Sequence, residues 1–352
     1  MAISRILEKL LNHISQEGAS DLHLVAGRVP VMRVNRELVP LTKEAVLSSD
    51  DMHAILLSVV SEDKVARVYA GHEIDFSFQF HDTLRLRGGA YRTSNGAGLA
   101  FRVVAEIKTL QELRLPESLA HFTRQKQGFF LIVGPTGQGK TTTMAALIDL
   151  INRERREHIV TIENPIEYLI RDKMSVVDQR EIGIDTGTFH EALRASFRQD
   201  VDVIMVGEMR DPETISTAVT AAETGHLVFS TLHTNDAAQT IDRIIDSFGA
   251  DQQRQVRNQL AASLLGIFSI RLIPSIKGGL VPAYELLINN NATQNLIREG
   301  RTHEIYSVIE TSRSEGMIDM NHSLLDLVRQ NEITIEDALR FSGDPEVLQS
   351  LI

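Results

Sequence analysis

The main evidence for the fold of this chain is the glycine-rich segment Gly134-Pro135-Thr136-Gly137-Gln138-Gly139-Lys140-Thr141. It matches the phosphate-binding loop pattern G-x-x-x-x-G-K-[ST] at every fixed position. A continuous apolar run, residues 129–133, precedes it and is typical of a buried strand, whereas residues 142–148 are typical of the first turns of a helix. The loop is therefore predicted to lie between a strand and a helix, as phosphate binding requires.

The residue types in this loop suit a phosphate group. Glycines let successive backbone N–H groups point into one concavity, and the helix that follows adds the positive end of its dipole. We expect Lys140 to reach the β- and γ-phosphates of a nucleotide and the Thr141 hydroxyl to ligate Mg²⁺. The predicted nucleotide-binding residues of this segment are Gly134, Pro135, Thr136, Gly137, Gln138, Gly139, Lys140, Thr141 and Thr142.

Composition narrows the class of protein. The 352 residues suggest two or three domains, and no apolar run approaches the roughly 18 residues of a membrane span. Residues 1–17 read as an amphipathic helix rather than a signal peptide. The chain has no cysteine, which excludes disulfides and thiolate metal sites and is consistent with the cytoplasm. The net charge of −11 argues against a protein that mainly coats nucleic acid.

The first 105 residues predict a small α+β domain with an antiparallel sheet. A helix is expected over residues 3–14, with Gly18 as its stop. Strands are expected at 19–25, 75–80, 84–87 and 99–104, with a hairpin of 31–34 and 38–41 around Asn35-Arg36 and a turn at His81-Asp82-Thr83.

Arginines gather in this predicted domain. Arg85 and Arg87 alternate with Leu86 and are expected on one face, with Arg92 and Arg102 nearby in sequence. One interpretation is a solvated strand face. The other is a cluster offered to the nucleotide of a neighbouring subunit, where an arginine stabilises charge on a transferring phosphoryl group.

Beyond a linker at 106–117, strands and helices alternate, which predicts an α/β domain with a parallel sheet over 118–273. Residues 158–163 form a predicted strand that ends in Glu163, and Glu167 follows after Asn164-Pro165. Ligands bind past the carboxyl ends of such strands, so Glu163 or Glu167 would orient an attacking water or take its proton. The alternative is two surface glutamates in a loop.

A second apolar strand, residues 201–206, precedes Gly207 and Glu208. We expect it to lie beside the strand that leads into the phosphate loop, with Glu208 holding Mg²⁺ through a water or polarising the nucleophile. Asp211, Pro212 and an acid at 213 predict the start of a helix that ends at residue 225.

A third strand, residues 226–235, carries a histidine near each end. His226 and His233 are an odd number of residues apart, so a regular strand points them to opposite faces and a shared zinc ion is improbable. His233 is a candidate γ-phosphate sensor, and His226 is either a second catalytic histidine or a structural one. From residue 274 the chain is predicted to be mostly helical, with short helices at 292–298, 302–310, 323–330 and 335–341.

These motifs together resemble the secretion-type ATPases and, within them, the PilT-like motors that retract type IV pili. The loop at 134–141 resembles the Walker A motif of that family, 161–167 its aspartate box, 203–211 its Walker B motif and 225–236 its histidine box. Residues 19–24 resemble the opening strand of PilT-like proteins, and 292–299 resemble a C-terminal helix associated with retraction.

The resemblance implies an ATP- and Mg²⁺-dependent hexameric motor. It implies a PAS-like N-terminal domain (1–105), a RecA-like ATPase core (118–273) and a helical C-terminal part (274–352). Glu208 and Glu167 would be the catalytic acids, with N-domain arginines reaching the nucleotide. The ring would lie at the cytoplasmic face of the inner membrane, bound there through a platform protein of the pilus machinery, and would power retraction and twitching motility. Extension motors of this family usually carry a four-cysteine zinc site, so the lack of cysteine favours the retraction branch.

Several positions depart from the family pattern. Asn164 replaces an aspartate, Gln138 stands where serine is common, and Val201 replaces a proline. Gly88-Gly89 alters the arginine-bearing strand, and Gln294 replaces an arginine of the retraction helix. Two alternatives follow: an accessory nucleotide-binding ring subunit resembling PilU, and a RecA-like nucleic-acid translocase. The acidic net charge and the 5% aromatic content argue against the translocase.

Overall fold

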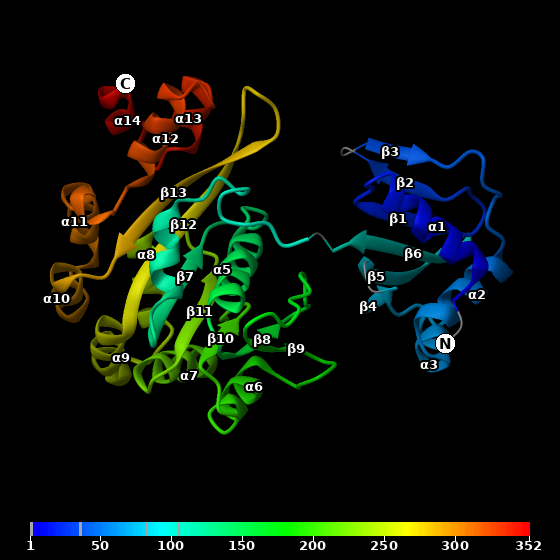
Figure 1. The fold of residues 1–352 in the computed structure, drawn as a ribbon, viewed down its shortest axis with the longest axis horizontal. Helices are drawn as coiled ribbons and strands as arrows, with labels where there is room; N and C mark the ends of the chain where they lie inside the picture. The colour runs from blue at the N-terminus through cyan, green and yellow to red at the C-terminus, as the bar shows by residue number, and fades with distance from the viewer. Residues whose placement is uncertain (1–2, 35–36, 82–83, 105) are drawn as a thin grey trace. The chain divides into compact units, whose positions relative to one another are not determined.

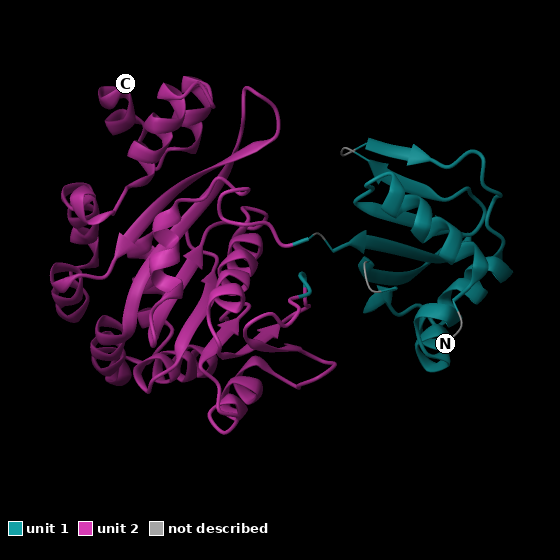
Figure 2. Cartoon of the chain, in the orientation of Figure 1, with its two compact units in different colours: residues 1–106, 167–169 teal, residues 107–166, 170–352 magenta. Residues whose placement is uncertain are grey.

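A computed structural model describes residues 3–34, 37–81, 84–104 and 106–352. These residues divide into two compact units, shown in Figure 2. Unit 1 contains residues 1–106 together with 167–169, and unit 2 contains 107–166 and 170–352. The predicted turn at Asn35-Arg36 lies outside the described residues, as do Asp82 and Thr83 of the second predicted turn.

Unit 1 is built on a six-stranded antiparallel sheet in the order β3-β2-β1-β6-β5-β4. The expected antiparallel sheet and its strands are present. Its elements along the chain are α1 (Arg5–Gln16), β1 (Asp21–Val25), β2 (Val31–Val34), β3 (Glu37–Pro40), α2 (Ser49–Val59), α3 (Glu62–Tyr69), β4 (Ile74–Phe80), β5 (Leu84–Thr93) and β6 (Gly96–Val103).

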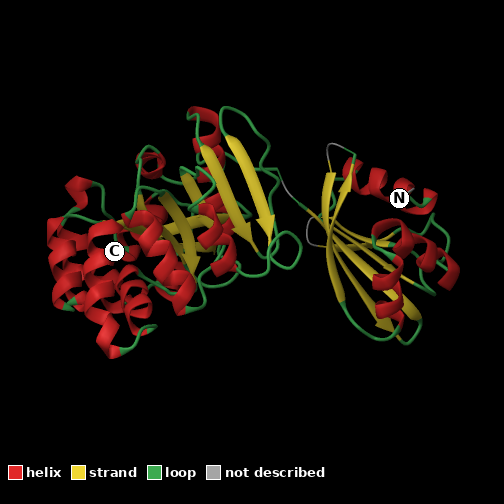
Figure 3. Cartoon of the chain, turned by 90° about the horizontal axis from the view of Figure 1, so that it is seen from below, coloured by secondary structure: helices red, strands yellow, loops and turns green. Residues whose placement is uncertain are grey.

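The two faces of this sheet differ because apolar and polar residues alternate along its strands. Leu22, Leu24, Leu86, Leu99 and Phe101 are buried and share one hydrophobic core with the apolar positions of α1 and α2. The helices of unit 1 lie on this side of the sheet (Figure 3). The opposite face carries the arginines described below.

Unit 2 contains a seven-stranded sheet in the order β13-β12-β7-β11-β10-β8-β9 (Figure 1). All neighbours in it are parallel except the pair β12 and β13. Its strands are β7 (Gly128–Val133), β8 (His158–Glu163), β9 (Val176–Glu181), β10 (Val203–Val206), β11 (Leu227–Leu232), β12 (Leu264–Pro274) and β13 (Leu280–Ile288). The predicted parallel α/β fold is confirmed.

One expectation about strand order is wrong. The strand beside β7 is β11, paired from Leu227 with Gly128 to Leu232 with Val133, and β10 lies one place further out. Both strands are buried along their whole length, so their sequences do not show which of them lies next to β7. On its other side β7 pairs with β12.

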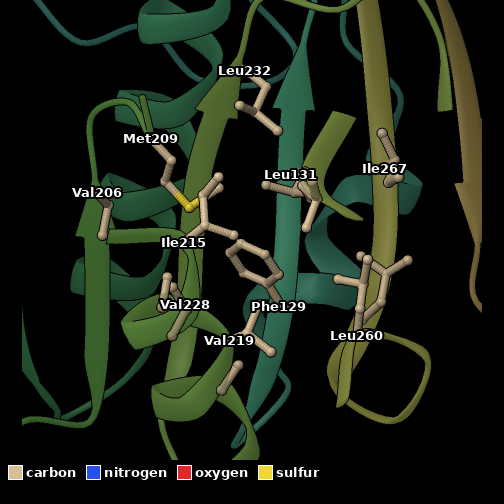
Figure 4. Packing of buried hydrophobic residues seen from close by; sticks show 14 of the residues in the cluster. Phe129, Leu131, Val206, Met209, Ile215, Val219, Val228, Leu232, Leu260 and Ile267 are labelled. Atoms are coloured by element: carbon tan, nitrogen blue, oxygen red, sulfur yellow. The ribbon is translucent and has the colours of Figure 1, made fainter. Parts of the chain in front are cut away.

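Helices cover both faces of the large sheet, which explains why its central strands are buried along their whole length and are mostly apolar. Leu147 and Ile148 of α5 (Lys140–Glu154) contact one face. Ile215 of α7 (Pro212–Glu223), Ile241 of α8 (Ala237–Asp246) and Leu260 of α9 (Ala250–Ser263) join the core on the other face. Figure 4 shows part of the second core between β7, β11 and α7. The smaller helices here are η1 (Glu117–Leu119), α4 (Ala120–Thr123) and α6 (Phe189–Ser196).

The C-terminal part is less helical at its start than expected, because β13 completes the sheet before the helices begin. The remaining elements are α10 (Asn291–Glu299), η2 (Thr302–Glu304), α11 (Ile305–Thr311), η3 (Arg313–Glu315), α12 (Met320–Arg329), α13 (Ile335–Phe341) and α14 (Pro345–Leu351). The last three pack on Ile273 and Val281 of the β12–β13 pair. Among the described residues, no helix combines the length and apolar character that crossing a membrane requires.

The segment predicted as a linker joins unit 2 from residue 107 onward. Leu110 and Leu115 are buried and belong to the same core as α5. Arg114 Nη1 donates to Glu332 Oε2 at 2.9 Å, which fixes the end of this segment to the C-terminal part of the unit. The freely linking part of 106–117 is therefore short.

Candidate nucleotide-binding site

The phosphate loop leaves β7 at Gly134 and enters α5 at Lys140, as predicted. Gly134, Gly137 and Gly139 have φ values of 147°, 78° and 85°, in the left-handed region that favours glycine. A Cβ on Gly134 would lie 2.5 Å from the Ile270 carbonyl oxygen of β12. Backbone strain and close packing therefore both require glycine at the start of the loop.

Lys140 folds over this loop. Its Nζ donates to the Gly134 carbonyl at 2.7 Å and to the Pro135 carbonyl at 2.9 Å. It also lies 3.3 Å from His233 Nδ1 at the end of β11. Burial lowers the pKa of the Lys140 ammonium, and the nearby Glu208 carboxylate acts in the opposite direction. The ammonium is thus a partly desolvated cation, which strengthens its attraction to an anion.

Glu208 lies just past the end of β10 and is half-buried. Its Oε1 pairs with Arg210 Nη2 at 2.8 Å, and its Oε2 lies 3.7 Å from His233 Nε2. Lys140, His233, Glu208 and Arg210 therefore form one continuous chain of contacts. The topology explains it, because β7, β11 and β10 are parallel neighbours whose carboxyl ends meet at one edge.

Glu163 ends β8, the next strand of the same sheet. Its buried Oε1 accepts hydrogen bonds from Thr161 Oγ1 at 2.7 Å and Gln179 Nε2 at 3.0 Å. An added Cβ on Gly207 would lie 3.2 Å from the Ile162 carbonyl and 3.5 Å from Glu163 Cα. This close approach gives a physical reason for glycine immediately before Glu208.

His226 does not join this group. It precedes β11, at the end of the strand opposite to His233, and its backbone carbonyl accepts from Gly128 at the start of β7. Its Nδ1 lies 3.1 Å from the Ala221 carbonyl, and its ring contacts Phe197 edge-on. These contacts support the structural interpretation, so a catalytic role for His226 has no geometric support within unit 2.

Thr141 and Thr142 occupy the first turn of α5, as predicted. The described residues contain no cluster of three or more acids and histidines able to hold a metal by themselves. The Thr141 hydroxyl and the Glu208 carboxylate are oxygen donors of the kind that Mg²⁺ takes together with phosphate oxygens and waters. This donor set fits a magnesium ion that arrives with a nucleotide.

Three of the four predicted arginines of unit 1 share one face of its sheet. Arg87 and Arg102 are directly paired across β5 and β6, and Arg85 is two residues from Arg87 on the same strand. Arg102 Nε donates to Asp21 Oδ1 at 2.9 Å, and Arg33 Nε lies 3.7 Å from the other oxygen of that carboxylate. The face therefore carries an excess of positive charge around one buried acid.

Arg92 and Glu167 both have hydrogen-bond partners in unit 1. Arg92 projects from the other face of β5, and its Nη1 donates to the Tyr69 carbonyl of α3 at 2.6 Å. Glu167 belongs to unit 1, where Arg87 Nη1 donates to its Oε1 at 3.2 Å. Within unit 2, the predicted acids that follow or end the parallel strands are Glu208 and Glu163.

Three side-chain contacts of this site were not predicted from the sequence. They are made by Arg210, Gln179 and the side chain of Gln138. Arg210 has a local signal, since it follows Glu208 by two residues. Gln179 pairs with Glu163 only because β9 lies beside β8 in the sheet. Gln138 Oε1 accepts from Leu272 N at 2.6 Å, a contact 134 positions apart in sequence that no local pattern contains.

Comparison with known proteins decides the family. The profile of the family described as "Type II/IV secretion system protein" matches residues 1–352. The chain belongs to this family. The type IV pilus retractation ATPase PilT of Pseudomonas aeruginosa is 41% identical over 341 residues, covering 97% of this chain and 99% of the relative. The type IV pilus ATPase PilU of the same organism is 39% identical, covering 98% of this chain and 91% of the relative.

A solved structure agrees with these secretion ATPase relatives. The crystal structure of the pilus retraction motor PilT with bound ADP has a TM-score of 0.91 and 44% identity, and covers 98% of this chain and 99% of its own. The predictions of a PilT-like secretion ATPase, of its two-part fold with a helical C-terminal part, and of a P-loop ATPase are confirmed.

Proposed function

We propose that this secretion ATPase is a ring-forming motor that hydrolyses ATP to retract type IV pili. The observation that carries the proposal is the chain of contacts from Lys140 through His233 to Glu208 and Arg210. In this chain of contacts the Lys140 ammonium lies close to an acid at one edge of the sheet. The similarity to PilT over nearly the whole length supports retraction as the work performed.

ATP and Mg²⁺ fit the residues present. The Lys140 ammonium has carbonyl partners that γ-phosphate oxygens would replace, because charged acceptors bind an ammonium more strongly than neutral carbonyls do. Backbone N–H groups at the start of α5 would hold the other phosphates. Thr141 and Glu208 would hold Mg²⁺, which would neutralise charge on the phosphates during transfer.

Hydrolysis would require a water molecule in line with the bond between the β- and γ-phosphates. The water oxygen would form a bond to the γ-phosphorus while the bond to the β-phosphate oxygen breaks, giving ADP and phosphate. Glu208 would orient this water and take its proton, with Glu163 as a second acid at the same edge. His233 lies close to both Lys140 and Glu208, so its contacts with both side chains would change when a γ-phosphate binds.

The site would be completed by a neighbouring subunit in a homohexamer. The face of the unit 1 sheet with Arg85, Arg87 and Arg102 would supply the cation that stabilises the departing phosphate. As the family resemblance implies, Glu167 would act on the same water together with Glu208. Splitting a site between subunits couples each hydrolysis step to a rigid-body domain movement.

The hexamer would act at the cytoplasmic face of the inner membrane. We propose that it binds a platform protein of the pilus machinery and reaches the membrane only through that partner. Its movement would withdraw pilin subunits from the fibre, as expected for a PilT-like protein, and this would drive twitching motility.

The decisive experiment is steady-state ATP hydrolysis by the purified protein, with and without DNA, for wild type and Glu208→Ala. We expect wild-type hydrolysis that DNA does not change and a loss of at least about 100-fold in the variant. Glu213→Ala is the matched control, because it removes an exposed glutamate from the first turn of the following helix. Mass photometry on each sample would test for the hexamer.

Two outcomes would replace this proposal with an alternative. A wild-type ring that assembles and binds ATP without hydrolysing it would support the alternative of an accessory nucleotide-binding subunit. The similarity to PilU is consistent with that alternative. Hydrolysis that rises steeply with DNA would support the nucleic-acid translocase. Equal activity of wild type and Glu208→Ala would show that the proposed acid is not catalytic.

A further inference from the structure

The edge of β12 changes its neighbour halfway along the strand. From Leu264 to Ser269 it pairs with β7, and the last pair joins Ser269 to Val133. Beyond this point β7 gives way to the phosphate loop, whereas β12 continues to Pro274 and remains paired with β13 on its other side. Within the part of the chain that the structure describes, no strand lies opposite the backbone groups of β12 that face the loop.

Gln138 takes the place of the missing strand. Its Oε1 accepts a hydrogen bond from the Leu272 backbone N–H at 2.6 Å, as a carbonyl of a paired strand would. The same short stretch of β12 contacts two glycines of the loop. Gly134 lies against the Ile270 carbonyl, and an added Cβ on Gly139 would lie 3.5 Å from the Leu272 side chain. The loop thus lies along β12 at three of its positions.

The residues next to this bond hold the C-terminal helices. Arg271 Nη1 donates to the Phe341 carbonyl at the end of α13 at 2.7 Å. A few residues further on, the Ile276 N–H donates to the Glu332 carbonyl at 2.8 Å, and Lys277 Nζ donates to the Glu332 carboxylate at 2.7 Å. One strand therefore connects the phosphate loop to the segment that carries α13.

We propose that Gln138 is a positioning residue that ties the phosphate loop to β12 and thereby couples nucleotide binding to the C-terminal helices. The inference rests on the proposed function, because it assumes that the loop binds a nucleotide. The amide side chain acts on the loop through the backbone of Leu272 and needs no contact with the nucleotide. A side chain too short to reach Leu272 removes this hydrogen bond between the loop and β12.

The test compares Gln138→Met with Gln138→Glu. Methionine keeps the length of the side chain and removes the acceptor, whereas glutamate keeps an acceptor for Leu272. Hydrogen exchange without nucleotide should show the Leu272 amide protected in wild type and Gln138→Glu and exchanging about fivefold or more faster in Gln138→Met. Gln138→Ser introduces the residue that is common in PilT-like proteins. Its Leu272 amide should exchange as fast as in Gln138→Met, so this variant can replace Gln138→Met if that variant fails to fold.

Nucleotide binding gives the second readout. ADP titrated into Gln138→Met should bind about fivefold more weakly, and the KM for ATP should rise by a similar factor with a smaller change in kcat. ADP should change exchange in residues 332–341 of wild type and leave that segment unchanged in the methionine variant. Wild-type values for Gln138→Met in both readouts would overturn the inference. A wild type that binds ADP and hydrolyses no ATP would overturn the proposed motor and leave this test intact.

Discussion

The two sheets of the molecule use their side chains in different ways. The antiparallel sheet of unit 1 has one apolar face under helices and one face with charged residues, including the paired Arg87 and Arg102. The sheet of unit 2 is covered on both faces, and its proposed catalytic groups, such as Glu208 and His233, follow the ends of its strands. A sheet with one free face can offer a charged surface, whereas a sheet with two covered faces can place chemistry only at its edge.

The largest expected effect is at the edge of the unit 2 sheet. Lys140→Ala removes the cation that lies between the loop carbonyls and His233, so ATP binding should fall and hydrolysis should drop below detection, by at least about 100-fold. Calorimetric titration and steady-state hydrolysis would measure both. Lys126→Ala, an exposed lysine before β7, is the control and should keep wild-type activity. Normal hydrolysis by Lys140→Ala would sink the mechanism.

The next effect tests how tightly the helix-covered face of unit 1 is packed. A Cβ on Gly88 would overlap the Phe76 ring, so Gly88→Ala should cost about 1–3 kcal/mol of folding stability. Its neighbour Gly89 projects to the other face, where an added Cβ would lie 3.5 Å from Asp75 Oδ1, and Gly89→Ala should cost little. Chemical denaturation of both variants would measure the difference. Equal losses would mean that the two faces are packed alike.

An effect that depends on pH concerns a buried acid of unit 2. Glu285 in β13 accepts from the Ala237 N–H at the start of α8. Burial is the main reason why the pKa of Glu285 is raised to about 7, and the nearby Asp236 and Asp319 contribute to this increase. The hydrogen bond from Ala237 acts in the opposite direction. The folded state therefore holds a proton that the unfolded chain releases near pH 4.5, and stability should fall as pH rises from about 4.5 to 7.

Glu285→Gln should remove this part of the pH dependence, because the amide stays neutral and still accepts from Ala237. The stability lost by wild type across the window should be on the order of 3 kcal/mol from this group. Denaturation curves between pH 4.5 and pH 8 would measure it, with Glu346→Gln on the exposed surface of α14 as control. Parallel pH profiles for wild type and Glu285→Gln would contradict the assignment.

Much of the candidate site could be predicted from local sequence patterns. The phosphate loop, the acid after β10 and the helix that begins at Asp211 all follow from short-range chemistry: glycine conformations, strand ends and the Asp211 carboxylate that accepts from Thr214 N at 2.7 Å. The resemblance to PilT-like proteins then supplied the fold of the whole chain. These features need only neighbouring residues, or a known relative, to be identified.

Strand order and long-range contacts could not be predicted in this way. The place of β11 between β7 and β10 depends on how equally buried strands are arranged in space. β12 follows α9 without a loop, so an apolar run there does not distinguish a helix from a strand. The placement of Arg92 against Tyr69, and of His226 away from the loop, depends on which side of a strand and which end of a sheet each residue occupies.

The pairing of β12 with β13 also has a mechanical meaning. The two strands are hydrogen-bonded from Gly266 to Pro274, and α12 to α14 pack on their far part. A pull on those helices along the strand direction would load many hydrogen bonds in shear at once instead of opening them one by one. β12 also borders the phosphate loop. The strand pair would therefore transmit a force on the C-terminal helices directly to the loop where the phosphates would bind.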